Sequence, residues 1–200
     1  MKAKIHPGEV IHSMDHLVLD LATPDGSVAY FTIYSLGFMR DVGTGLVALV
    51  RVTTSDGILD RCFGETIGLA ARLQRRLRGI RSEGGAAPAV GVDHTPVQAS
   101  IRRIATFGQG EQWLVESADD TISASWSAAE TPFWLSAPAP AFHPSRDYVT
   151  TMISYRRAEL VVNGTAASGV PYSHSGWEER LGQPFSSCHV ALAETAIEAG

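Results

Sequence analysis

Alternation of apolar and polar residues with a period of two restricts the fold of this chain more than any other feature. Between Thr121 and Ala128, apolar residues at the even positions alternate with serines at positions 123, 125 and 127. Successive side chains of a β-strand point to opposite faces of the sheet, so this segment has one dry face and one wet face. Such a segment is typical of an antiparallel sheet with one side packed on a core.

Turn residues separate further segments with strand-like patterning. Pro24-Asp25-Gly26 combines a proline that presets φ with a glycine that accepts positive φ, and Asn163-Gly164 is a strong hairpin signal. A partner strand is expected from Thr165 towards Tyr172. The other predicted strands cover residues 13–21, 28–38, 43–54, 97–107, 111–116, 121–128, 148–162 and 184–192. The sequence therefore predicts a mainly β fold, either an antiparallel β-barrel or a curved β-sandwich.

One amphipathic helix is predicted from Glu65 to Ile80. Leu69, Leu73 and Leu77 recur at helical spacing and form an apolar stripe, while arginines cover the other faces. The glycine- and proline-rich segment 82–91 that follows is expected to be a flexible loop. We expect the helix and this loop to be an insertion in a single β-barrel-like domain, residues 1–200.

Composition excludes several classes of protein. The chain has 200 residues, of which 44% are hydrophobic and 18% charged, and this balance is typical of a globular protein rather than a disordered one. A net charge of −5 argues against nucleic acid as a partner. The two cysteines, Cys62 and Cys188, exclude a disulfide framework. No apolar run is long enough to span a membrane and no secretory signal opens the chain, so a cytoplasmic protein is expected.

Common cofactor and catalytic motifs are absent from the sequence. It contains no GxSxG, no HExxH and no P-loop, so no cofactor is expected. His12 and His16 share a face, but spacing places no third ligand beside them, and we therefore expect no metal. The arginines between Arg72 and Arg81 are typical of a solvated helix face, with an anionic ligand as the alternative interpretation.

Chemically active side chains are densest between Tyr172 and Arg180. In an extended segment Tyr172 and His174 point to the same side, and a turn at Gly176 would bring Glu178 towards them. We expect His174 to act as the acid or base and Glu178 to orient it or donate a proton, while Tyr172 hydrogen-bonds a developing oxyanion or hydroxyl. The alternative is a packed Trp177 with a surface ion pair beside it.

Aromatic residues are the candidates for lining an apolar cavity inside the barrel. Such rings can stabilise a carbocation through their π faces, although they are equally common in cores. The predicted ligand-binding residues are Tyr30, Tyr34, Phe38, Trp126, Trp134 and Trp177.

The segment Tyr172–Arg180 resembles the Asp-His-Ser-Trp-Gly-x-Arg signature of lipocalin-like proteins related to carotenoid 1,2-hydratases. Leu160–Gly164 and Gly169 resemble the hairpin that precedes the signature, and Leu17–Leu36 is similar to that family's first hairpin. So is the stretch between Trp113 and Trp126. The chain departs from the signature where Ser173 replaces its aspartate. The resemblance implies a lipocalin-like barrel that takes an isoprenoid, a polyketide or another small lipophilic molecule.

Three functions remain open at this point. The first is a cofactor-free enzyme that cyclises, hydrates or isomerises a small lipophilic molecule by acid–base chemistry. The second is a non-catalytic carrier of such a molecule. The third is a partner-binding domain that uses an exposed apolar stripe on the helix Leu69–Ile80. A homodimer is one expected assembly.

Overall fold

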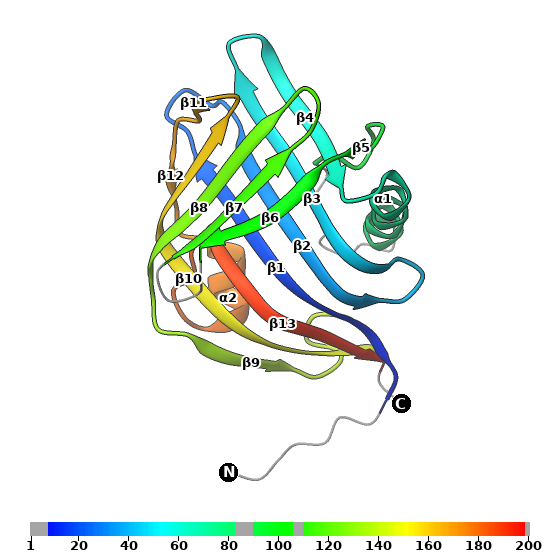
Figure 1. The fold of residues 1–200 in the computed structure, drawn as a ribbon. Helices are drawn as coiled ribbons and strands as arrows, with labels where there is room; N and C mark the ends of the chain where they lie inside the picture. Colours follow the sequence, from blue (N-terminus) through cyan, green and yellow to red (C-terminus); the bar gives the residue numbers. More distant parts are fainter. Residues whose placement is uncertain (1–7, 83–89, 106–109, 199–200) are drawn as a thin grey trace.

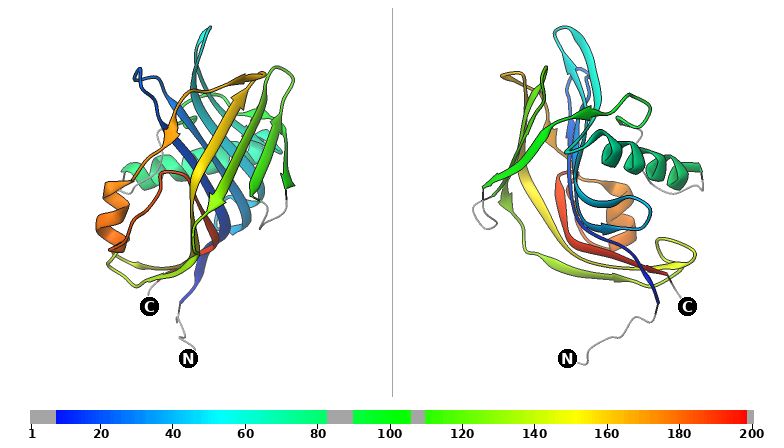
Figure 2. Two further views of the ribbon diagram at one scale, coloured as in Figure 1. Left: turned by 90° about the vertical axis from the view of Figure 1, so that its left-hand side faces the viewer. Right: turned by 45° about the vertical axis from the view of Figure 1, so that its right-hand side comes forward.

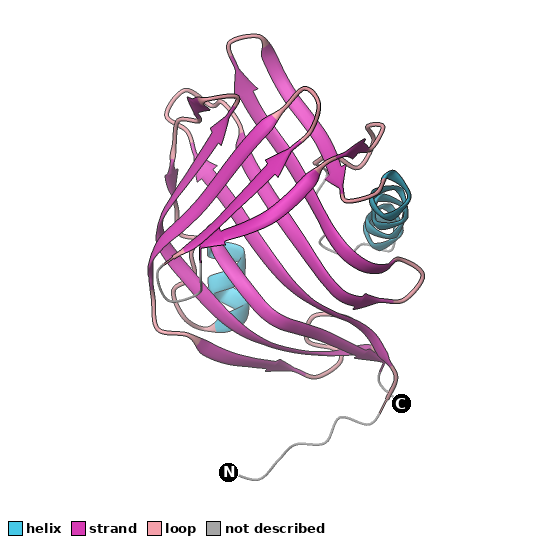
Figure 3. Ribbon diagram, in the orientation of Figure 1, coloured by secondary structure: helices cyan, strands magenta, loops and turns pink. Residues whose placement is uncertain are grey.

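A computed structural model describes residues 8–82, 90–105 and 110–198, and strands dominate them (Figures 1 and 3). The mainly β fold predicted from the alternation is confirmed, as a nearly closed barrel. Its strands are β1 (Val10–Ala22), β2 (Ala29–Met39), β3 (Gly43–Thr54), β4 (Gly57–Gly64), β5 (Val97–Gln98), β6 (Ser100–Ala105), β7 (Glu111–Glu116), β8 (Thr121–Ala129), β9 (Phe133–Ala137), β10 (Arg146–Val162), β11 (Thr165–Ala166), β12 (Val170–Pro171) and β13 (His189–Glu198).

Strand pairing carries the sheet around the barrel in the order β5-β4-β3-β2-β1-β13-β10-β8-β7-β6. The two ends of this path meet in the chain, because only Ala99 separates β5 from β6 and its amide donates a hydrogen bond to the Gly64 carbonyl (2.9 Å). β4 and β5 are parallel, whereas the other pairs are antiparallel. The barrel is therefore mixed, which differs from the purely antiparallel sheet predicted.

The two helices found among the described residues lie on the outer face of the sheet. In the right-hand view of Figure 2 they are on one side of β1–β4, while β6–β8 are on the other. Helix α1 (Ile67–Ser82) matches the predicted helix to within two residues, and the Thr66 hydroxyl caps it by accepting a hydrogen bond from the Leu69 amide (3.1 Å). Helix α2 (Ser175–Leu181) was not predicted. None of the helices among the described residues is long and apolar enough to cross a membrane.

The apolar stripe of α1 packs on the sheet. Leu69, Leu73 and Leu77 are buried against side chains of β2 and β3, including Leu36 and Leu49. The exposed apolar stripe that a partner-binding helix would require is therefore not present on this part of α1.

The barrel interior is filled by its own side chains. Large residues from every major strand form one buried cluster, among them Phe31, Phe63 and Trp126, each exposed by no more than 1%. The indole nitrogen of Trp126 donates a hydrogen bond to the carbonyl of Val18 across the core (2.8 Å). These side chains therefore meet across the interior of the barrel.

Several predicted boundaries differ from the structure. A strand, β4, follows the Ser55-Asp56-Gly57 turn where no strand was predicted, and the final strand runs over His189–Glu198 rather than 184–192. The strand expected from Thr165 is instead two short strands, β11, which pairs with β10, and β12, which pairs with β1. Most of the predicted loop 82–91, namely residues 83–89, lies outside the described residues.

Packing of α1 on the sheet predicts the effect of two substitutions on stability. Leu73→Ala removes a fully buried side chain and should lower the free energy of unfolding by about 2–5 kcal/mol. Ile67→Ala, on the same helix, removes a half-exposed side chain and should change it by no more than about 0.5 kcal/mol. Urea denaturation measures both values. Equal effects of the two variants would contradict the packing of α1 described above.

Candidate functional site

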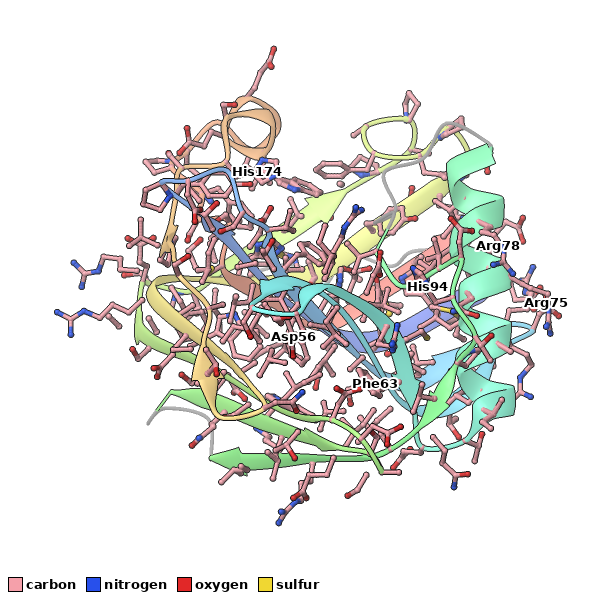
Figure 4. The ribbon with its side chains drawn as sticks, turned by 90° about the horizontal axis from the view of Figure 1, so that it is seen from above. Asp56, Phe63, Arg75, Arg78, His94 and His174 are labelled. Atoms are coloured by element: carbon pink, nitrogen blue, oxygen red, sulfur yellow. The ribbon has the colours of Figure 1, made fainter. Side chains whose placement is uncertain are left out.

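The rings of Tyr172 and His174 lie face to face just before α2. Their centroids are 6.2 Å apart and their planes differ by 19°. The prediction that these two side chains point to the same side is confirmed. Figure 4 shows His174 beside α2. The indole ring of Trp177, on α2, lies 6.5 Å from the imidazole of His174 and also contacts Phe142 and Phe185.

Glu178 is engaged by its own loop. Its carboxylate accepts hydrogen bonds from the Ser173 hydroxyl and from the backbone N–H of Phe185 (3.1 Å). The first of these bonds, and then the second, lower the pKa of Glu178. Among the described side chains, no hydrogen bond joins Glu178 to His174. No direct contact therefore supports the orienting role predicted for Glu178.

Asp20 of β1 is the carboxylate that contacts this group. The Tyr172 hydroxyl donates a hydrogen bond to its Oδ2 atom (2.7 Å). Burial raises the pKa of Asp20, against smaller opposing effects of this bond and of the charge of His174. Burial and the same bond raise the pKa of the Tyr172 phenol. A shallow depression of about 220 Å³ lies beside the pair, lined in part by Tyr172, Glu178 and Phe185.

The six aromatic residues predicted to bind a ligand do not share one cavity wall. Trp126 is enclosed in the core, whereas Phe38 and Trp134 are exposed on β2 and β9. Trp177 packs outside the barrel in the cluster under α2. Tyr30 and Tyr34 lie on the outer face of β2, in the cluster under α1.

A cluster of two histidines and one glutamate lies on the outer face of β1 and β13. His12 Nε2 is 3.2 Å from Glu194 Oε1, and His16 Nδ1 is 3.9 Å from Glu194 Oε2. The side chains of His12, His16 and Glu194 are exposed by 11%, 20% and 19%, so each is mostly buried yet still reaches solvent. Sequence spacing paired His12 with His16 but did not find Glu194.

A β-bulge in β13 brings Glu194 to this face. Ala191 lies opposite His16, and Glu194 lies opposite Met14. Between these two pairs β13 therefore contains one residue more than β1. Ala193 occupies the bulge with a φ of 49°, and its N–H donates to Asp15 Oδ1 (2.8 Å). The extra residue reverses the alternation of inward and outward side chains. Regular alternation would have turned Glu194 towards the core.

The hydrogen bonds of Thr32 define the proton position on His16. The Thr32 hydroxyl donates to the carbonyl of Leu17 (2.7 Å), so it accepts at its other contact, with Nε2 of His16 (3.0 Å). Nε2 therefore carries the proton, and Nδ1 faces Glu194. The ring of His16 also stacks on Tyr34, with centroids 4.5 Å apart and planes 14° apart. These contacts fix the orientation of the imidazole on both sides.

Glu194 stays ionised in this setting. Burial by itself would raise its pKa, but the hydrogen bonds and charges of His12 and His16 outweigh burial and hold the pKa well below the usual range. Burial raises the pKa of the neighbouring Tyr34 phenol. The carboxylate therefore accepts the hydrogen bond from Nε2–H of His12, and the Nδ1 atom of His16 faces it at 3.9 Å.

His189 is a third imidazole on the same face and is neutral. Its Nδ1 donates to the carbonyl of Ser186 (3.2 Å), and its ring lies 4.6 Å from that of Phe185. Burial, with a further contribution from the charge of His16, lowers the pKa of His189 to about 3. Because a carbonyl oxygen can only accept a hydrogen bond, the proton of neutral His189 is on Nδ1, and Nε2 has the lone pair.

Apolar clusters flank these polar groups on both sides. His16 pairs across the sheet with Tyr34, which belongs to the cluster under α1, and with Ala191, which belongs to the cluster under α2. Apolar walls around a few fixed polar groups are typical of small-molecule sites.

A metal site is not indicated at this face. Among the described residues, no group of three or more histidine, cysteine, aspartate or glutamate side chains is arranged to hold a metal ion. Cys62 and Cys188 are free and buried, and burial raises their pKa values to about 12 and about 11. Neither thiol is a nucleophile at neutral pH.

Comparison with protein-family models and with curated protein sequences finds no match. The resemblance to lipocalin-like proteins related to carotenoid 1,2-hydratases therefore stays a prediction. Among solved structures, the chain is similar to an acetoacetate decarboxylase from Legionella pneumophila, with 9% sequence identity, coverage of 100% of this chain and 91% of that chain, and a TM-score of 0.39. This likeness is too low for residues to be carried from one chain to the other.

Neutral, buried His189 predicts a specific dependence of stability on pH. The unfolded chain takes up a proton near pH 6.5 and the folded chain only near pH 3, so stability falls as the pH drops between these values. The slope due to this one group approaches about 1.4 kcal/mol per pH unit. His189→Asn keeps a donor for the Ser186 carbonyl and should remove this contribution in urea denaturation series measured from pH 7 to pH 4.

The matched control is His94→Asn, because the His94 side chain is about half exposed. This variant should keep the slope of the unsubstituted protein. If the free energy of unfolding of His189→Asn depends on pH as steeply as that of the unsubstituted protein, His189 takes up its proton in the folded state, and the prediction is wrong.

Proposed function

We propose that this protein binds a small, mainly apolar molecule on the outer face of its barrel and moves a proton on it without a cofactor. The observation that carries the proposal is the contact of two oriented imidazoles with one ionised carboxylate, at His12, His16 and Glu194. Apolar clusters on both sides of this group support a lipophilic substrate of the isoprenoid or polyketide kind. Cyclisation, hydration and isomerisation of such molecules each need a proton to be added or removed.

His12 has the contacts of a general base. Its Nε2–H is held by Glu194, which leaves Nδ1 to take a proton from the substrate. The carboxylate then stabilises the imidazolium that forms, as in other carboxylate–histidine pairs. His16 is the second imidazole of the group, held by Thr32 and Tyr34. Its Nδ1 faces the same carboxylate, so a proton on either ring is stabilised by one charge.

Tyr172 and His174 are the competing location for the same chemistry, in the roles that the sequence predicted. Two contacts favour the first location. The proton of the Tyr172 hydroxyl is already donated to Asp20, so it is not available to a developing oxyanion. The carboxylate of Glu178 is occupied by Ser173 and a backbone N–H. We therefore propose His12 as the acid or base. His174 takes this role if substitution of His12 and His16 leaves turnover unchanged.

Imine chemistry does not fit the described residues. The lysines of the sequence are Lys2 and Lys4, and both lie outside the described ranges. Among the described residues, therefore, no lysine amine lies at the outer-face site.

Substitution of the histidines tests the proposal. Isoprenoid and polyketide-type compounds are screened for binding by ligand-observed NMR, and the products of each binder are followed by mass spectrometry. His12→Gln and His16→Gln should each lower turnover by roughly 10²–10⁴-fold while the fold is retained, because general acid–base catalysis contributes that much. Circular dichroism verifies the fold of each variant.

Two further variants complete the test. His94→Gln changes a half-exposed histidine and should leave turnover unchanged. His174→Gln should have a small effect. If His174→Gln abolishes turnover while His12→Gln and His16→Gln do not, the reactive group is the Tyr172–His174 pair. Binding without any product would identify a carrier and reject the catalytic proposal.

A further inference from the structure

A pocket of about 230 Å³ lies between α1 and the turn that joins β2 to β3. The turn contributes Asp41 and Val42. Helix α1 contributes Arg72, Arg75, Arg76 and Gly79. Three arginine residues thus line one small pocket, in a chain whose net charge is −5.

The positive charge of this pocket is not balanced by its own helix. Residues 67–82 include five arginines and no acidic residue. Of the three pocket arginines, Arg72 is held in place because its Nε–H donates to the Val42 carbonyl (2.7 Å). Within the described parts of the chain, no carboxylate forms an ion pair with Arg72, Arg75 or Arg76. Figure 4 shows Arg75 extending outward from α1.

The turn that lines the pocket directly follows the part of β2 that pairs with His12. His12 lies opposite Met39 in the β1–β2 register, and the N–H of the next residue, Arg40, donates to the Ile11 carbonyl (2.8 Å). The pocket wall begins at Asp41, directly after these contacts. From the other side, the ring of Tyr148 lies 6.0 Å from that of His12.

The charge of Arg76, in the pocket, acts on Tyr148, whose ring contacts His12. Burial raises the pKa of the Tyr148 phenol, and the side chain and charge of Arg146 oppose that effect. The charges of Glu194 and Arg76 also act on this phenol, in opposite directions. Tyr148 thus contacts the ring of His12 and lies within reach of the charges of Glu194 and of Arg76.

We propose that the pocket formed by Arg72, Arg75 and Arg76 binds the carboxylate or phosphate group of the small molecule on which His12 and Glu194 act. The substrate class is accordingly a lipophilic anion. This inference rests on the proposed function for the reactive part of the substrate, whereas the binding of the anion itself does not. Guanidinium groups recognise carboxylates and phosphates by paired, charge-assisted hydrogen bonds.

A membrane surface does not fit this helix as the source of the anion. The leucines of α1 are buried against the sheet, so the basic face has no apolar face beside it to enter a bilayer. The occupant we propose is therefore a soluble molecule that places one anionic group in the pocket.

Asp41 and Gly79 give the pocket two further testable properties. Asp41 places a negative charge on the wall, which opposes an anion. A Cβ atom added at Gly79 meets no other atom within 4 Å, so a larger side chain at this position extends into open space and narrows the pocket. Asp41→Asn should therefore strengthen anion binding, and Gly79→Leu should weaken it without a change in charge.

Titration with inorganic phosphate and with acetate tests the proposal, with amide chemical shifts of α1 and the β2–β3 turn followed by NMR at constant ionic strength. We expect saturable binding at these residues. The double substitution Arg75→Gln and Arg76→Gln should weaken it at least about tenfold, because each lost charge-assisted contact is worth that much. Arg102→Gln removes one positive charge from an exposed arginine on β6 and should change the dissociation constant by less than about twofold.

The outcomes separate this inference from the proposed function. His16→Gln should leave phosphate binding unchanged even where it abolishes turnover. The inference is overturned if neither anion binds saturably, if Arg102→Gln weakens binding as much as the double variant, or if Asp41→Asn weakens it. It is also overturned if vesicles of phosphatidylglycerol bind the protein through Arg75 and Arg76 while glycerol phosphate does not. Loss of turnover in His16→Gln with no anion binding would support the proposed function alone.

Discussion

Closure of the sheet is the constraint on which the rest of this structure depends. The strand segments on either side of Ala99 join β4 to β7, and with this contact the inner face becomes a continuous apolar cluster. Phe31, Phe63 and Trp126 fill much of that interior, and the buried carboxylate of Glu111, on the same face of β7 as Trp113, is stabilised there by its ion pair with Arg103. The polar residues of β1, β2 and β13 gather on the outer face, where α1 and α2 cover part of the sheet.

The outer face combines burial with partial access to solvent, and acid–base chemistry needs both. Between the two helices, Glu194 is buried enough for its charge to act strongly on neighbouring rings, yet it keeps its charge because His12 and His16 contact it. His189, without a carboxylate contact, is neutral in the same surroundings. Burial is the main cause of the neutral state of His189, whereas the contacts with two imidazoles outweigh burial at Glu194. Acid–base sites commonly use such separation of roles.

Much of the candidate site was visible in the sequence as separate parts. Tyr172 and His174 were expected on one side of the chain, and their rings are indeed adjacent. The expected partner of His174 was Glu178, because it is near in sequence. Its carboxylate instead contacts Ser173 and the Phe185 amide, since helix α2 begins at Ser175. Asp20, which contacts Tyr172, is 152 residues away and gave no sequence signal.

The sequence alone determined most of the strands, although not β4 or β9, together with the apolar face of those strands and the position of α1, because these properties depend on residues within a few positions of one another. Only the tertiary structure decided that Glu194 joins His12 across 182 residues. That contact depends on the register between β1 and β13 and on a bulge at Ala193, an ordinary alanine with a positive φ. Register and bulges arise from pairing between distant strands, and a one-residue shift moves a side chain to the opposite face.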